Sequence, residues 1–372
     1  LARDVHGESV NTLGEGTLGV VLREPIGVVS IITPWNFPFL IVSQKLPFAL
    51  AAGCTAVVKA SELTSGSTLV MGEILMKAGL PPGVVNIIVG TGVDAGAPIT
   101  AHHDVDMISF TGSTAVGKLT MANAALTLKK VSLELGGKNP QIVFPDANLD
   151  EFVDAAAFGG YFNAGECCNA GSRLIIHRSI ADDVTERIRA VSEKVKVGDP
   201  LNPETQVGAI ITTQHLSKIE GYVRGASDNG AKVALGGGAL DFGMGQYMNP
   251  TIISGVQPQM AVAREEVFGP VLSVLTFEDF DDAVRIANSI DYGLSASVWS
   301  ANMDNCLRIG RKVRAGTVWM NTYMDGAAEL PFGGYRQSGL GRELGRHAVE
   351  DYTESKTLNM HIGPRTAWWM PR

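Results

Sequence analysis

The sequence predicts an α/β protein built on a doubly wound parallel sheet. Short runs of β-branched and apolar residues, the pattern of strands buried on both faces, recur through the first third of the chain. Helical patterns separate these runs, which implies βαβ crossovers. The length of 372 residues indicates two or three domains. We therefore expect the ligand of this sheet to bind at the carboxyl ends of its strands.

Five strands are predicted in this first sheet. They are residues 27–33 (GVVSIIT), 55–60 (TAVVKA), 84–89 (VVNIIV), 106–110 (DMISF) and 130–135 (KVSLEL). The clearest helix between them covers residues 64–78, with Ser61 as its expected cap and Gly79 and Pro81 at its end. The apolar residues that share one face of this helix are Leu69, Val70, Ile74 and Leu75.

A second α/β unit is predicted from Lys138 onward. The runs PQIVF (140–144) and RLIIH (173–177) have the composition of strands, and helical stretches lie between and after them. Between the two runs lies the segment YFNAGECCNAGSR (161–173), which carries a pair of cysteines.

Composition and charge exclude several classes of function. Hydrophobic residues make up 45% of the chain and charged residues 18%, as in a folded protein. The net charge is −8 and no block of Lys and Arg occurs, so nucleic acid is an unexpected partner. The apolar runs are shorter than the ~20 residues of a membrane span. Four cysteines without zinc spacing predict no metal site and a reducing, cytoplasmic setting.

The segment FTGSTAVGKLT (110–120) resembles a phosphate-binding loop. It follows the Walker A pattern until Leu119, which cannot supply the hydroxyl that binds Mg²⁺. A strand, a glycine turn and a helix start near Thr114 can still hold another phosphate on free backbone N–H groups. The alternative is a tight turn with Ser113 or Thr114 as a helix cap. The first strand-to-helix turn reads TPWNFP in place of a dinucleotide fingerprint, so these motifs alone leave a nicotinamide cofactor undecided.

The cysteine pair, Cys167 and Cys168, is the strongest chemical signal. Cysteines in a loop of small residues are typical of an accessible thiol, which becomes nucleophilic where the thiolate is favoured. We interpret Cys54 and Cys306 as buried small hydrophobic residues. Glu134 ends a predicted strand against a glycine turn, where it is either a base or a capping or surface residue. A nucleophilic cysteine with a carboxylate base suggests formation and hydrolysis of a thioester.

Seven motifs together resemble the aldehyde dehydrogenase superfamily. In chain order they are TPWNFPF, VVKASE, FTGSTAVG, LELGGK, NAGECCNAGSR, EEVFGPV and PFGGYRQSGLGRELG. The resemblance covers essentially the whole chain. It implies a Rossmann-type coenzyme domain, an α/β catalytic domain and a β-hairpin oligomerisation element that forms dimers or tetramers.

The resemblance also implies domain boundaries. The coenzyme domain would cover residues 26–136, with an N-terminal portion found in other members missing, and the catalytic domain residues 137–337. Residues 338–351 would be a return segment, and residues 7–25 with 352–362 the oligomerisation element.

Site residues are implied by the same resemblance. Cys168 is the expected nucleophile, Glu134 the general base and Asn36 the oxyanion-hole amide. The residues expected to bind the cofactor are Ile32, Trp35, Lys59, Ser61, Glu62, Gly112, Ser113, Leu135, Glu266 and Phe268. The residues expected to line the substrate tunnel are Phe37, Ile41, Gln44, Phe162 and Phe332.

The implied reaction is the oxidation of a small-molecule aldehyde to its acid. The carboxylate of Glu62 would repel a 2′-phosphate, so the resemblance implies NAD in preference to NADP, although NADP remains an alternative. Two other interpretations stay open. One is a relative that transfers the acyl group to coenzyme A, and the other is a non-catalytic structural member of the family.

Overall fold

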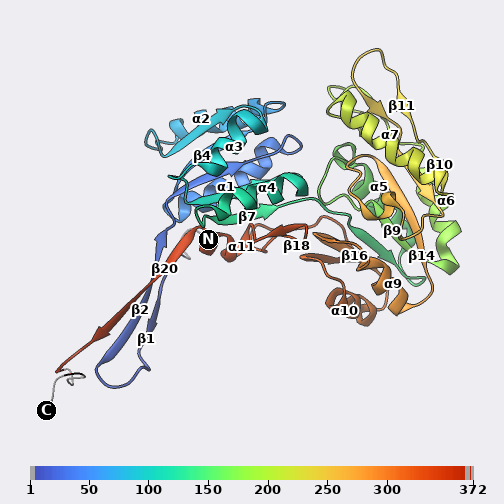
Figure 1. Cartoon of the computed structure of the whole chain (residues 1–372). Helices are drawn as coiled ribbons and strands as arrows, with labels where there is room; N and C mark the ends of the chain where they lie inside the picture. The colour runs from blue at the N-terminus through green and yellow to red at the C-terminus, as the bar shows by residue number, and fades with distance from the viewer. Residues whose placement is uncertain (1–4, 365–368, 370–372) are drawn as a thin grey trace.

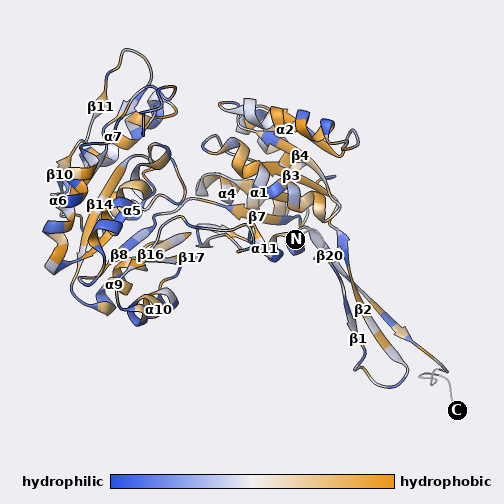
Figure 2. Ribbon diagram, turned by 180° about the vertical axis from the view of Figure 1, so that it is seen from behind, coloured by the Kyte–Doolittle hydropathy of each residue, from blue (hydrophilic) through white to orange (hydrophobic). Residues whose placement is uncertain are grey.

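Two sheet-centred bodies and a long antiparallel arm make up the chain (Figure 1). The computed structural model describes residues 5–364 and Trp369. Hydrophobic residues run along the central strands of both sheets, which helices cover (Figure 2). The α/β class predicted from the sequence is confirmed.

The first sheet has six strands in the order β19-β7-β6-β3-β4-β5. Its parallel strands are β3 (Val28–Ile32), β4 (Thr55–Ala60), β5 (Val85–Val89), β6 (Met107–Thr111) and β7 (Lys130–Glu134). Strand β19 (Gly339–Leu340) pairs antiparallel with β7. The helices of this body are α1 (Pro38–Ala51), α2 (Ser65–Lys77), α3 (Ala97–Ala101), α4 (Thr114–Ala125) and α11 (Gly345–Asp351). All five predicted strands are present.

The strand order of this sheet reverses between β3 and β6. The chain builds β3, β4 and β5 outward on one side, then returns to place β6 and β7 on the other side of β3. Ligands of open α/β sheets bind outside the carboxyl ends of the strands at such a reversal. At this edge Ile32 of β3 aligns with Lys59 of β4 and with Phe110 of β6, while Thr111 of β6 aligns with Glu134 of β7.

Helix α2 differs in two respects from its prediction. Its N-cap is Thr64, whereas the Ser61 hydroxyl accepts the Leu63 N–H at 3.3 Å, so Ser61 is not the cap. Leu69, Val70 and Ile74 are 45%, 48% and 47% exposed, so they do not form a buried face. The helix contacts the sheet through another stripe, Thr68, Met71 and Leu75.

The second sheet has seven strands in the order β10-β13-β14-β9-β8-β16-β17. Their bounds are β8 (Pro140–Val143), β9 (Arg173–His177), β10 (Lys232–Leu235), β13 (Thr251–Ser254), β14 (Val271–Phe277), β16 (Ser295–Trp299) and β17 (Thr317–Met320). The helices are α5 (Leu149–Tyr161), α6 (Ala181–Ser192), α7 (Thr213–Asp228), α8 (Ala261–Arg264), α9 (Phe280–Ala287) and α10 (Met303–Lys312). The largest hydrophobic cluster of the molecule fills this body.

The arm is a separate three-stranded sheet that projects from the first body (Figure 1). It consists of β1 (Glu8–Val10), β2 (Thr17–Pro25) and β20 (Thr353–His361), and β20 pairs with β2 along its whole length. Residues 338–351 return the chain to the first body, since Ala348 and Val349 of α11 enter its core. Within the described part of the chain, no helix combines the length and apolarity needed to cross a membrane.

Candidate active site

Glu134 ends β7 with a buried carboxylate, and neither carboxylate oxygen has a hydrogen-bond partner among the described residues. Gly333 lies against it with φ +156°, and a Cβ there would lie 2.7 Å from Glu134 Oε1. Only glycine leaves this space. The carboxylate is therefore free to accept a proton.

A buried ion pair lies close to Glu134. Lys45 Nζ of α1 is 2.6 Å from Glu343 Oε1 and 3.0 Å from the Ser109 hydroxyl. Burial and the charge of Glu343 raise the pKa of Glu134 well above its usual value, against the opposing charges of Lys45 and Arg342. Neither Lys45 nor Glu343 was among the predicted site residues, although the GRELG motif and a lysine within an apolar helix were signals for them.

The nucleophile loop, residues 162–169, turns sharply after α5. Asn163 and Ala164 have left-handed φ values of 51° and 56°, which are uncommon for residues other than glycine. After this turn Cys167 is buried and Cys168 is partly exposed. The Asn139 amide donates to the Cys168 carbonyl at 2.7 Å and to the Ala170 carbonyl at 3.0 Å. Asn139, which the sequence analysis missed, therefore fixes the backbone of the nucleophile.

The two thiols of this loop stand on consecutive residues and influence each other's ionisation. The Cys167 thiol, burial, and the charges of Glu266 and Glu134 raise the pKa of Cys168 well above its usual value. A thiol must lose its proton before it can attack. Glu134 is close enough for its charge to affect the Cys168 thiol, so the carboxylate and the nucleophile share one site.

Asn36 lies in the turn after β3 and faces the nucleophile loop. Its Nδ2 donates to the Glu166 carbonyl at 3.0 Å, two residues before Cys168. The structure thus brings together the three residues that the sequence analysis placed in catalysis, Cys168, Glu134 and Asn36.

The residues predicted to hold the adenosine end lie after β4. Lys59 Nζ is 3.3 Å from Glu62 Oε2, and Lys59 is buried while the Glu62 side chain is 42% exposed. Ser61 is buried beside them, and Ile32 is buried at the end of the neighbouring strand. These side chains therefore meet at one end of the carboxyl edge.

The turn after β6 combines a cap with a free helix start. The Ser113 hydroxyl accepts the Val116 N–H at 3.3 Å, which is the capping role that the sequence analysis kept as an alternative. Gly112 lies on the same edge, because its N–H donates to the Glu134 carbonyl at 3.0 Å. Leu135 packs against Gly117 of α4. The first turn of α4 therefore faces the edge with its remaining N–H groups.

The segment with Glu266 and Phe268 approaches the same edge from the second body. Glu266 Oε1 accepts the Gly137 N–H at 2.9 Å, and burial raises the pKa of Glu266 to about 7. Phe268 has φ +59° and packs edge-on against Trp35, with ring centroids 5.5 Å apart. Phe268 therefore contacts the first body through Trp35.

Three of the predicted tunnel residues are aromatic, and two of these stack on each other. Phe37 and Phe162 stack with centroids 5.9 Å apart, and Phe158, which was not predicted, packs on Phe162 at 5.1 Å. Phe332 is held by two main-chain hydrogen bonds to Glu343. Ile41 and Gln44 lie on α1, the first buried and the second half-buried.

The other two cysteines have structural positions. Cys54 and Cys306 are buried, and their thiols donate to the carbonyls of Tyr352 and Ser300. The interpretation of both as small hydrophobic residues agrees with these positions.

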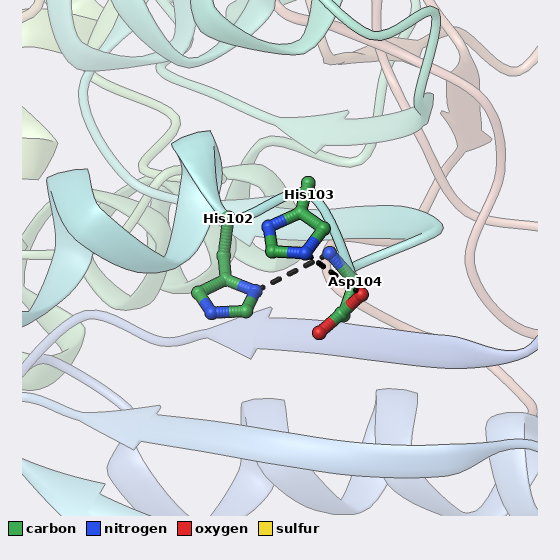
Figure 3. Close-up of side chains that lie close together, drawn as sticks. All are labelled: His102, His103 and Asp104. Atoms are coloured by element: carbon green, nitrogen blue, oxygen red, sulfur yellow. Dashed lines mark hydrogen bonds and ion pairs between the residues drawn. The ribbon is translucent and has the colours of Figure 1, made fainter.

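One cluster of metal-binding side chain types lies on the surface after α3. His102, His103 and Asp104 have ligand atoms within 4.8 Å of one another, and all three are exposed (Figure 3). They are consecutive in a turn, where the His102 Nδ1 already accepts the Asp104 N–H at 3.3 Å. Their proximity follows from this turn and does not indicate a built metal site.

Comparison with known proteins agrees with this site. The profile of the aldehyde dehydrogenase family matches residues 1–358. The chain is 44% identical to a putative aldehyde dehydrogenase of Bacillus subtilis, DhaS, over 91% of this chain and 68% of that protein. It is 43% identical to the chloroplastic betaine aldehyde dehydrogenase of Beta vulgaris, over 94% of this chain and 70% of that protein.

Solved structures give the same result. The NAD-dependent aldehyde dehydrogenase of Sinorhizobium meliloti superposes with a TM-score of 0.97 at 48% identity, over 99% of this chain and 73% of that one. The betaine aldehyde dehydrogenase of Staphylococcus aureus, in complex with NAD⁺, superposes with a TM-score of 0.97 at 40% identity, over 100% of this chain and 74% of that one. On its sequence, its fold and these matches, the chain belongs to the aldehyde dehydrogenase family.

Proposed function

We propose that this chain oxidises an aldehyde to its carboxylic acid with NAD, through a thiohemiacetal and a thioester on Cys168, with Glu134 as the base that activates water. The observation that carries the proposal is the meeting of a partly exposed cysteine with an unpartnered buried carboxylate at the carboxyl edge of the first sheet. A cysteine nucleophile and a carboxylate base are the groups needed to form a thioester and then hydrolyse it.

The residues along this edge fit a dinucleotide. Lys59 and Glu62 would hold the adenosine ribose, Gly112 and the start of α4 the pyrophosphate, and Glu266 with Phe268 the nicotinamide end. The positions of Ile32, Trp35, Ser61, Ser113 and Leu135 along the same edge are compatible with supporting contacts. When bound, NAD supplies the hydride acceptor for the oxidation.

The remaining steps belong to side chains of this chain. The Cys168 thiol, which is partly exposed, first loses its proton to solvent. Its thiolate attacks the aldehyde carbon, and the resulting alkoxide would be stabilised by the Asn36 amide and the main-chain N–H of Cys168. After oxidation the acyl group is a thioester on Cys168. Glu134 then takes a proton from water, and the hydroxide attacks the thioester, so that the C–S bond breaks, the acid is released and Cys168 leaves as its thiolate. Its raised pKa makes it a stronger base than an exposed glutamate.

Two alternatives lead to different measurable products. A coenzyme A-acylating enzyme would need coenzyme A to complete its turnover, and a non-catalytic member would form no NADH. We expect NADH formation from a panel of neutral, aromatic and cationic aldehydes at a rate that coenzyme A does not change. Strict dependence on coenzyme A, or no NADH with any aldehyde, would contradict the proposal. The same panel identifies the preferred aldehyde.

The carboxylate of Glu62, beside Lys59, predicts a preference for NAD over NADP. Glu62→Gln keeps the size of the side chain but removes the negative charge that would repel a 2′-phosphate. We expect the ratio of kcat/KM for NAD to that for NADP to fall by about tenfold, chiefly through a lower KM for NADP. The control is Glu73→Gln, an exposed glutamate on α2. Equal ratios in the wild type and Glu62→Gln would mean that another group recognises the ribose.

The arm supports self-association as a dimer or tetramer. It exposes apolar side chains, and its outer strands carry main-chain groups able to pair with another chain. The exposed apolar residues are Leu13, Leu358, Met360 and Ile362. A chain ending before β20 should be monomeric in light scattering if the arm is the interface. The cytoplasm is the proposed location, because the reactive thiol requires a reducing environment.

A further inference from the structure

The buried carboxylate of Glu166 has no part in the mechanism just described. Glu166 stands two residues before Cys168, and its side chain is 6% exposed. Its Oε1 accepts the Ile211 N–H at 3.0 Å and lies 3.8 Å from His215 Nε2. Its main-chain carbonyl accepts the Asn36 amide. The residue therefore links the nucleophile loop and the oxyanion amide to the start of α7.

His215 continues this link on the other side. It lies in the first turn of α7, and its Nε2 is 2.7 Å from the Phe268 carbonyl, so the imidazole N–H donates to that oxygen. Its ring stands edge-on to both Trp35 and Phe268, with centroids 6.0 Å apart in each case. Phe268 has a left-handed backbone that a phenylalanine adopts only when neighbours hold it there.

We propose that Glu166 and His215 form a positioning pair that fixes the nucleophile loop relative to the segment carrying Glu266 and Phe268. Glu166 ties the loop of Cys168 to the start of α7, and His215 holds the carbonyl of Phe268 from the same turn. This inference rests on the proposed function, because it assigns Phe268 to the nicotinamide end of NAD. The pair acts through Phe268 and the Cys168 loop, without touching the reacting atoms.

The ionisation of Glu166 should change this link near neutral pH. Burial raises the pKa of Glu166 to about 7, and burial lowers the pKa of His215, so the imidazole stays neutral there. Above about pH 7 the ionised Glu166 competes with the Phe268 carbonyl for the His215 N–H. The hydrogen bond from His215 to the Phe268 carbonyl then weakens, and the affinity for NAD falls. Lys218 of α7 also lowers the pKa of His215. The other ionisable groups on the packed segments are Cys167, Cys168, Glu220, Tyr222, Arg224, Asp228, Arg264, Glu265 and Glu266.

Calorimetric titration with NAD tests the role of His215 without relying on activity. We expect His215→Ala to weaken NAD binding by about tenfold, because the Phe268 carbonyl loses its donor. His215→Gln, whose amide N–H can replace that donor, should bind NAD within about threefold of the wild type. At saturating NAD, His215→Ala should change kcat less than it changes the KM for NAD. The control is Gln214→Ala, the exposed neighbour on the same helix.

The variant Glu166→Gln tests whether the ionisation of Glu166 changes the affinity for NAD. The glutamine keeps an oxygen that can accept the Ile211 N–H but cannot ionise. The ratio of the wild-type Kd for NAD to that of the variant should rise several-fold from pH 6 to pH 8, and this ratio cancels the titration of Glu266, whose pKa is also about 7. The same pH dependence in the variant, or wild-type NAD binding by His215→Ala, would overturn the positioning pair. A wild-type protein that does not bind NAD at all would instead overturn the proposed function.

Discussion

Replacing Cys168 with alanine is expected to abolish NADH formation, with kcat lower by about 10⁴-fold or more. The thiol supplies the only bond between enzyme and substrate in the proposed mechanism, and alanine cannot form it. NAD affinity should change by less than about twofold, because the adenosine end is proposed to bind at Lys59 and Glu62 on another strand end. Steady-state absorbance of NADH and calorimetric titration with NAD measure the two quantities.

Cys167→Ala is the matched control for this experiment. Cys167 is adjacent to the nucleophile in sequence, but it is buried where an aldehyde has less access. Its replacement should lower kcat by no more than about threefold, mainly because removal of the buried sulfur leaves a small cavity. It also removes the neighbouring thiol that raises the pKa of Cys168. An inactive Cys167→Ala beside an active Cys168→Ala would reverse the assignment of the nucleophile.

The features that could be predicted from the sequence are those that depend on neighbouring residues. A strand buried on both faces is a short run of apolar residues, which can be recognised without knowing the rest of the fold. The bounds of β4 and β9 therefore agree with their predictions to the residue. The pair of cysteines was recognisable because it stands in a loop of small residues, and Glu134 because it ends a strand against a glycine turn. The choice of Cys168 within the pair and the role of Asn36 came from the family resemblance alone.

The features that could not be predicted depend on contacts between distant segments. Lys45 and Glu343 are 298 residues apart, and neither residue alone differs from a surface charge until the fold buries both. The role of Asn139 also depends on a distant contact, because its amide donates to the Cys168 carbonyl 29 residues away. The link from Glu166 to His215 likewise forms only in the folded chain. The wrong cap on α2 has a local cause, because Ser61 forms a turn with Leu63 that ends before the helix begins.

Glu134→Gln should separate the two chemical steps of the reaction. Glutamine has nearly the same shape, so Gly333 can still accommodate it, but an amide cannot take a proton from water. If Glu134 acts only in hydrolysis, thiohemiacetal formation and oxidation continue, and the enzyme accumulates as a thioester. The variant should then release about one NADH per active site before it slows. Loss of a general base costs on the order of 10²–10⁴ in rate, which makes hydrolysis limiting.

Rapid mixing with excess aldehyde and NAD, followed by NADH absorbance, distinguishes the outcomes for Glu134→Gln. A burst with a slow steady state, and an acyl adduct on Cys168 by mass spectrometry, is the expected result. Neither burst nor adduct would mean that Glu134 acts earlier, by taking the proton of the Cys168 thiol, whose pKa is also raised. Wild-type turnover would remove Glu134 from the mechanism and make Glu266 the next base to test. In the wild type, the raised pKa of Glu134 means that hydrolysis should slow as pH falls through that value, because protonation removes the base.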